Sequence, residues 1–230
     1  TVVMVTHDLD SIWSTVDRLA VLADKKVIVE GTLDEVCQAS HPEVKAFFHE
    51  PSFTITYVVH GGVGNKCVII DSVLDYDFKS GRTSTEAADE VVAFIEEKKL
   101  QVRWILETHV HADHLSAAPY LKSKLGGEIC IGAHVPIVQE AFKGIFNFGS
   151  EMSTNGDQFD RLLKDGDILE FGDLEIVTLV TDGHTPACMS YVIDNAIFVG
   201  DTLFMPDFGT ARCDFPGGDA AQLYKSIQKL

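Results

Sequence analysis

Three histidines and one aspartate lie within residues 109–114: His109, His111, Asp113 and His114. Neutral imidazole and carboxylate groups suit zinc, iron or manganese, whereas softer metals favour thiolate ligands. A solvated polar loop is the alternative, but this many ligand-type residues at such close spacing are hard to explain without a metal. Because His109 and His111 alternate, a regular strand could not point both the same way, so a loop must direct them toward separate positions. The cluster therefore predicts a metal centre.

Two downstream turns carry further residues of the same types. His184 follows a predicted strand over 174–180, and Asp201 follows a predicted strand over 196–199. Taken singly, a histidine or aspartate on a loop is most often solvated. The cluster at 109–114 also follows a predicted strand, so all three sets of ligands stand at strand ends, where active sites of α/β folds commonly lie. We therefore expect them to share one site.

The elements that must position these residues alternate along the chain from Phe53 onward. Apolar residues spaced at helical intervals predict amphipathic helices at 85–100, 115–125 and 220–230. Strands are expected at 54–59, 67–70, 102–106, 129–131, 168–171, 174–180, 190–193 and 196–199. Mixed strands and helices over about 180 residues predict one α/β domain.

Composition excludes several classes of partner. Acidic residues outnumber basic ones by 35 to 18, which gives a formal net charge of −17, so nucleic acid and anionic membranes would meet like charge. No apolar run approaches the ~18–20 residues of a membrane span. Five cysteines without framework spacing favour a reducing compartment, and we expect a cytoplasmic protein that could form a homo-oligomer.

The N-terminal residues resemble a different family of proteins from the rest of the chain. The runs VMVTHDLDS at 3–11 and DRLAVLADKKVIVEGT at 17–32 resemble the C-terminal end of an ABC-transporter ATPase subunit, in which His7 would be the switch histidine. The chain contains no phosphate-binding loop of the form G-x-x-x-x-G-K-[ST], so this segment cannot hydrolyse ATP. We expect residues 1–45 to be an N-terminal α/β appendage, with a hairpin at 19–29 and a junction within 41–52.

Residues 46–230 resemble the metallo-β-lactamase fold. The matching motifs are HVHADH at 109–114, GHT at 183–185 and GDTLF at 200–204. The resemblance implies an α/β (α+β) fold, an αβ/βα sandwich with its metal site at one edge. That family continues past the third motif with further strands, helices and a last histidine ligand, so we expect a C-terminally incomplete domain. The threonine at position 1 suggests that the other end is also cut.

Two further segments resemble the persulfide dioxygenases: IIDSVLDYDFKSGRTS at 69–84 and TARCDFPGGDA at 210–220. This resemblance implies one Fe(II) per chain, held by His109, His184 and Asp201, with no catalytic residue beyond the metal site. The remaining cluster residues would orient these ligands and tune the iron, namely His111, Asp113 and His114. The implied reaction consumes O₂ and a persulfide such as glutathione persulfide and yields sulfite and a thiol.

Two alternatives remain open because ligand types alone do not separate them. In a glyoxalase II-like thiolester hydrolase, His111, Asp113 and His114 would help hold a second metal, typically zinc, with Asp201 bridging the two ions. The chain could instead be an inactive fusion remnant or an accessory chain associated with a transporter.

Arg212 is the candidate for gripping a substrate carboxylate, because its planar guanidinium pairs with carboxylates through two hydrogen bonds. A positive side chain also stands out in so acidic a protein. The competing interpretation is a salt bridge with Asp214 or Asp207. The neighbouring Cys213 is expected to be a small packed thiol.

Overall fold

The computed structural model describes residues 19–23, 26–31, 54–204 and 208–230. The chain divides into two compact units, of which one spans Thr6–Ile55 and the other includes Thr56–Leu230. In the smaller unit, β1 (Leu19–Ala23) and β2 (Lys26–Gly31) pair antiparallel, which confirms the predicted hairpin. His7 lies outside the described residues, and the domain boundary near residue 45 stays a prediction.

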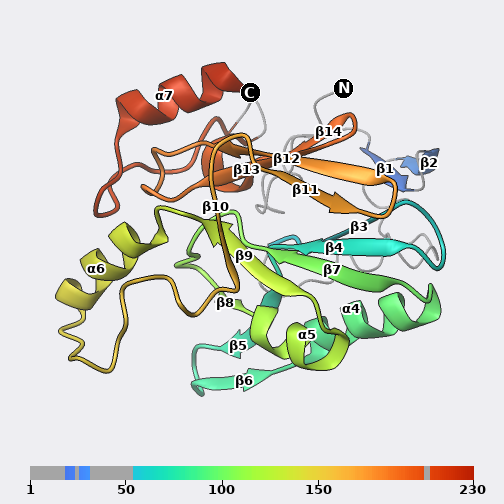
Figure 1. Cartoon of the computed structure of the whole chain (residues 1–230), viewed down its shortest axis with the longest axis horizontal. Coiled ribbons are helices and arrows are strands. Elements are labelled where there is room, and N and C mark those ends of the chain that lie inside the picture. Colours follow the sequence, from blue (N-terminus) through green and yellow to red (C-terminus); the bar gives the residue numbers. More distant parts are fainter. Residues whose placement is uncertain (1–18, 24–25, 32–53, 205–207) are drawn as a thin grey trace. The chain divides into compact units, whose positions relative to one another are not determined.

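Two main sheets and a small three-stranded one, of order β6-β5-β8, belong to the larger unit (Figure 1). The first has the order β10-β9-β7-β4-β3, in which β3 is antiparallel and the others are parallel. Its strands are β3 (Tyr57–His60), β4 (Lys66–Ile70), β7 (Gln101–Leu106), β9 (Glu128–Gly132) and β10 (Arg161–Leu163). The second is antiparallel throughout, with the strands β11 (Ile168–Phe171), β12 (Leu174–Val180), β13 (Met189–Ile193) and β14 (Ala196–Phe198).

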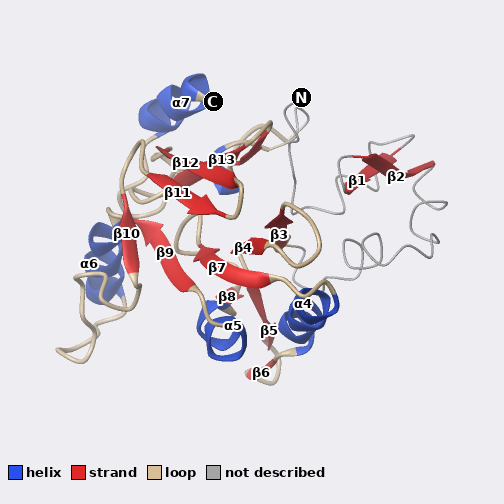
Figure 2. Ribbon diagram, turned by 45° about the vertical axis from the view of Figure 1, so that its right-hand side comes forward, coloured by secondary structure: helices blue, strands red, loops and turns tan. Residues whose placement is uncertain are grey.

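Helices cover the outer faces of the two sheets. Figures 1 and 2 show α4 (Glu86–Glu97) and α5 (Ala118–Leu125) below the first sheet and α7 (Ala220–Lys229) beyond the second. A further helix, α6 (Val135–Ile145), follows β9. The layers are therefore helix, sheet, sheet and helix, which is the αβ/βα sandwich that the sequence predicts. No helix in the described ranges is long and apolar enough to cross a membrane.

Strand β4 shows how the sequence builds two cores at once. Alternate side chains of a strand point to opposite faces, so Val68 and Ile70 pack against the second sheet while Cys67 and Ile69 pack against α4 and α5. All four side chains are fully buried. This explains the continuous apolar run, which is typical of parallel strands covered on both faces. The rigid sheet that results holds the loops at its carboxyl edge.

The structure corrects one predicted boundary and adds elements. Helix α5 begins at Ala118 rather than at residue 115, because Leu115–Ser116 forms a short strand, β8, that pairs with β5 (Val73–Asp77). Other elements also had no predicted counterpart: β5 itself, its antiparallel neighbour β6 (Arg82–Ser84), β10 and α6.

Candidate metal centre

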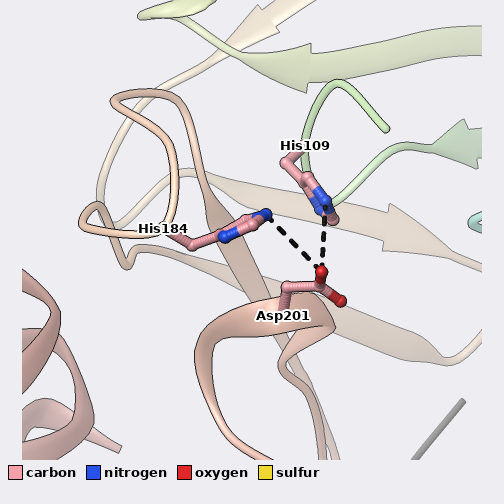
Figure 3. A group of neighbouring side chains, drawn as sticks. All are labelled: His109, His184 and Asp201. Carbon is pink, nitrogen blue, oxygen red and sulfur yellow. Dashed lines mark ion pairs between the residues drawn. The ribbon is translucent and has the colours of Figure 1, made fainter. Parts of the chain in front are cut away.

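His109, His184 and Asp201 converge from three separate elements (Figure 3). His109 follows β7, His184 lies on the loop between β12 and β13, and Asp201 belongs to the 3₁₀ turn η1 (Gly200–Thr202) after β14. The Nε2 atoms of the two histidines lie 3.8 Å and 3.5 Å from Asp201 Oδ2. The histidine rings are buried and Asp201 is partly exposed. Asp201 is therefore the member of the group that reaches solvent.

A hydrogen bond at Nδ1, on the side of each ring away from Asp201, fixes the orientation of His109 and His184. His184 Nδ1 lies 2.7 Å from the carbonyl oxygen of Arg212, so Nδ1–H donates to it. His109 Nδ1 lies 3.0 Å from Thr108 Oγ1, whose own proton goes to Asp71. Both rings therefore carry hydrogen on Nδ1 and keep the Nε2 lone pair for the centre. Such partners hold the ring orientation and the tautomer of metal-binding histidines.

Two glycines allow the three loops to meet. Gly183 has φ +140°, and a Cβ there would lie 2.4 Å from the backbone of Leu223 in α7. Gly200 has φ +50°, and a Cβ there would lie 2.4 Å from Thr108 Oγ1. The glycines beside His184 and Asp201 thus meet a close approach that no side chain permits.

The other residues of the histidine cluster form a second group. Ligand atoms of His111, Asp113 and His114 all lie within 4.8 Å of one another. The His114 ring is buried, and neither of its nitrogens has a hydrogen-bond partner among the described residues, although Nδ1 lies 3.3 Å from Asp113 Oδ1. The nearby His114 ring holds the pKa of the Asp113 carboxyl well below its usual range. An unsatisfied buried imidazole beside an ionised carboxylate fits a site for a cation.

Asp71 and Glu107 are functional candidates that the sequence reading missed. Asp71 accepts hydrogen bonds from Thr108 N (2.7 Å) and Thr108 Oγ1 (2.8 Å), and Glu107 accepts one from Ser116 Oγ (2.5 Å). Both carboxylates also approach His111 Nε2, at 3.2 Å and 3.3 Å. Burial lowers the pKa of His111, but the two carboxylates outweigh burial and raise it well above the usual value.

A signal for these two acids was present in the chain. Each follows the last residue of a buried parallel strand, and the register pairs Ile70 with Leu106, so Asp71 and Glu107 stand side by side at the edge that carries His109. Acidic residues directly after adjacent parallel strands are candidates for such a site.

Arg212 contacts the centre through its backbone rather than its side chain. The guanidinium is largely exposed and makes two hydrogen bonds, of 2.5 Å and 2.7 Å, to Asp214, which is one of the two partners weighed from the sequence. The ring of Phe215, in the same segment, meets the His184 ring edge-on at 5.2 Å. A role of Arg212 in substrate binding stays a prediction.

The donor types decide which ions suit the first group. Two imidazole nitrogens and one carboxylate are ligands for zinc, iron or manganese. This group of three described residues contains no cysteine. The buried rings, their fixed tautomers and the partly exposed Asp201 therefore fit a divalent metal that keeps room for other ligands.

Comparison with known proteins places this geometry in context. A sequence profile described as "Metallo-beta-lactamase superfamily" matches residues 50–230. The "Probable metallo-hydrolase" of Burkholderia pseudomallei is 56% identical over 197 residues, covering 81% of this chain and 67% of the relative. "Glyoxylase B2" of Dictyostelium discoideum is 52% identical over 167 residues, covering 72% of this chain and 57% of the relative.

Similarity to a dioxygenase is more distant. The mitochondrial "Persulfide dioxygenase ETHE1" of Homo sapiens is 29% identical over 188 residues, covering 81% of this chain and 61% of the relative. The crystal structure of ETHE1 from Myxococcus xanthus superposes with a TM-score of 0.56 at 26% identity, covering 76% of this chain and 63% of that one. The chain spans about half to two thirds of the length of the curated relatives it matches. The resemblance of residues 1–45 to an ATPase tail stays a prediction.

Proposed function

Since this chain belongs to the metallo-beta-lactamase superfamily, which supports a metal-dependent enzyme, we propose that it is a persulfide dioxygenase with one Fe(II) per chain. Two histidines and one carboxylate on a single face, with the other positions open, are typical of non-haem Fe(II) oxygenases. The group His109, His184 and Asp201 is the observation that carries the proposal. The ETHE1 relatives, which are named as persulfide dioxygenases, also support it. Their sequence identity to this chain is lower than that of the relatives whose names favour a hydrolase.

The chain's own residues would hold and orient the reactants. The Nε2 atoms of His109 and His184 and the Asp201 carboxylate would bind the ion from one side, while Thr108 and the Arg212 carbonyl keep both rings in place. Bound Fe(II) would supply the redox chemistry between O₂ and the terminal sulfur. One persulfide, one O₂ and one water give one thiol, one sulfite and two protons. A carboxylate of a glutathione-like substrate would exchange with Asp214 for the Arg212 guanidinium.

Oxygen uptake after anaerobic Fe(II) loading tests this reaction. We expect uptake that depends on glutathione persulfide and yields one sulfite per O₂, and we expect it to vanish in His184→Ala. The matched control is His60→Ala, because His60 Nδ1 accepts a hydrogen bond from Gly62 N away from the cluster. Iron-loaded, folded protein without persulfide-dependent uptake would overturn the proposal. A folded chain that retains no metal would favour the inactive remnant instead.

A thiolester hydrolase is the second candidate function. The names "Probable metallo-hydrolase" and "Glyoxylase B2" favour it, as does the second group of His111, Asp113 and His114 beside the first. Two metals in such a site generate a hydroxide nucleophile at neutral pH. Metal analysis separates the candidates: about two zinc ions per chain together with cleavage of a glutathione thiolester would favour the hydrolase.

A further inference from the structure

A cavity of about 730 Å³ lies outside the metal centre. It is bordered by α7, the end of β12, the loop after β12 and the segments that follow β9 and β10 (elements labelled in Figure 1). Small-molecule sites typically enclose about 300–1,000 Å³ and have mostly apolar walls. Here the apolar part of the wall is formed by Ala133, Leu163, Val180, Ala187 and Met189, beside polar and charged side chains. The cavity therefore has the size and the lining of a site for a small organic molecule.

Lysines supply the charge at this cavity. The Lys229 ammonium already has partners, because it pairs with Asp165 and donates to the Val180 carbonyl oxygen at 3.1 Å. Lys164 and Lys225 also line the cavity, and neither ammonium makes an ion pair with any residue in the described ranges. Asp165 and Asp182 also line the cavity, so the two lysines without an ion pair leave its lining with a small excess of positive charge. These two lysines favour a ligand that carries an anionic group.

Asp182 supplies an acceptor. Its Oδ2 lies 3.2 Å from His134 Nδ1, but its Oδ1 is buried and has no hydrogen-bond partner among the described residues. A buried oxygen without a donor is costly, so a ligand that offers an O–H or N–H group would satisfy it.

We propose that this cavity binds a small organic acid with an apolar tail and a hydroxyl or amino group. The carboxylate would lie between Lys164 and Lys225, the tail would cover Leu163 and Met189, and the donor would reach Asp182. The cavity is separate from the three ligands of the metal centre, although Asp182 and Ala187 belong to the loop that carries His184. The site thus extends beyond the proposed reaction and does not depend on it.

Titration with matched probes tests the proposal on the whole 230-residue chain. 3-Hydroxyoctanoate is the probe, and 1,3-octanediol is its uncharged counterpart with the same tail and hydroxyl. We expect saturable binding of the acid by calorimetry, with amide chemical-shift changes at Ala133 and Ala187. Binding of the diol should be at least about tenfold weaker, because it cannot pair with the lysines. The measurement needs neither bound metal nor turnover, so its result is independent of the proposed enzyme function.

Two double variants of equal charge complete the test. Lys164→Glu with Lys225→Glu should weaken binding of the acid at least about tenfold, and higher salt should narrow that difference. Lys66→Glu with Lys79→Glu changes the net charge equally at exposed positions outside the cavity, and it should bind the acid within about twofold of the original chain. Equal binding of acid and diol, or equal loss in both variants, would overturn the proposal.

Discussion

The two groups of potential ligands at the sheet edge differ in how the fold supports them. His109, His184 and Asp201 come from three strand ends, and partners behind both rings fix their orientation. His111, Asp113 and His114 come from one loop, and the His114 nitrogens lack hydrogen-bond partners within the described part of the chain. A ligand set held in place before the metal arrives loses less conformational freedom on binding. We therefore expect the first group to bind metal more tightly than the second.

The largest expected effect comes from removing one ligand of the first group. His184→Ala should lower the affinity for the first metal by more than about 100-fold, since loss of an outer-shell partner alone costs 10–100-fold. His114→Ala is the matched change in the second group and should leave the first affinity nearly unchanged. Competition with a chelator measures both dissociation constants. Equal losses in the two variants would show that the groups bind as one unit.

A change in loop packing should affect stability next most strongly. Gly183→Ala places a Cβ against the backbone of Leu223, so we expect a loss of about 3 kcal/mol or more in the free energy of unfolding, with weaker metal binding. Gly166→Ala is the control, because Gly166 also has positive φ, at +77°, but a Cβ there would meet nothing within 4 Å. That variant should lose only about 1 kcal/mol. Urea denaturation compares the two, and similar losses would contradict the role of the close approach.

Substitution of Asp71 should lower the metal affinity more than substitution of Glu107, although both acids contact His111. Asp71→Asn keeps an oxygen for only one of the two Thr108 donors, N and Oγ1, and thereby loosens His109, so metal affinity should fall by about 10–100-fold. Glu107→Gln keeps an oxygen for Ser116 Oγ and should cost less than about tenfold. Thermal unfolding of each variant separates a loss of fold from a loss of affinity. The reverse order would assign the main orienting role to Glu107.

The smallest effect concerns pH in the metal-free chain. The folded pKa of His111 lies well above its usual value of 6.5, so the stabilisation from its proton is complete below about pH 6.5 and is lost as pH rises through the folded pKa. One group changes the free energy of unfolding by at most about 1.4 kcal/mol per pH unit. We expect the chain to lose stability as pH rises above about 6.5, and His111→Gln to lack that slope. Denaturant curves in the presence of EDTA provide the measurement, and an unchanged slope in the variant would contradict it.

Local patterns were enough for much of the fold and for the first ligand group. The continuous apolar run of β4 and the histidine cluster directly after β7 located the sheet and the edge that carries the site. His184 and Asp201 were recognisable because each follows a predicted strand and a glycine. The structure brings both to His109, as expected, while their role as metal ligands stays a prediction.

Other features depend on contacts that no local pattern specifies. Asp71 and Glu107 meet only because Ile70 and Leu106 pair across β4 and β7, and register is a property of two distant segments. Residues 115–116 pair with β5 for the same reason, which delays the start of α5. The Arg212 carbonyl has no residue type, so its bond to His184 is invisible in a sequence.

Burial in the core, including both faces of the first sheet, affects the reactivity of the chain's cysteines. Cys67 and Cys130 lie in its strands and Cys188 precedes β13, and burial raises the pKa of all three thiols to about 12. At pH 7 only about one molecule in 10⁵ would carry the thiolate at any such position, and the thiolate is the form that attacks electrophilic sulfur. Cys213 is partly exposed and differs from them in this respect. We therefore expect these three cysteines to react slowly with oxidants and alkylating reagents.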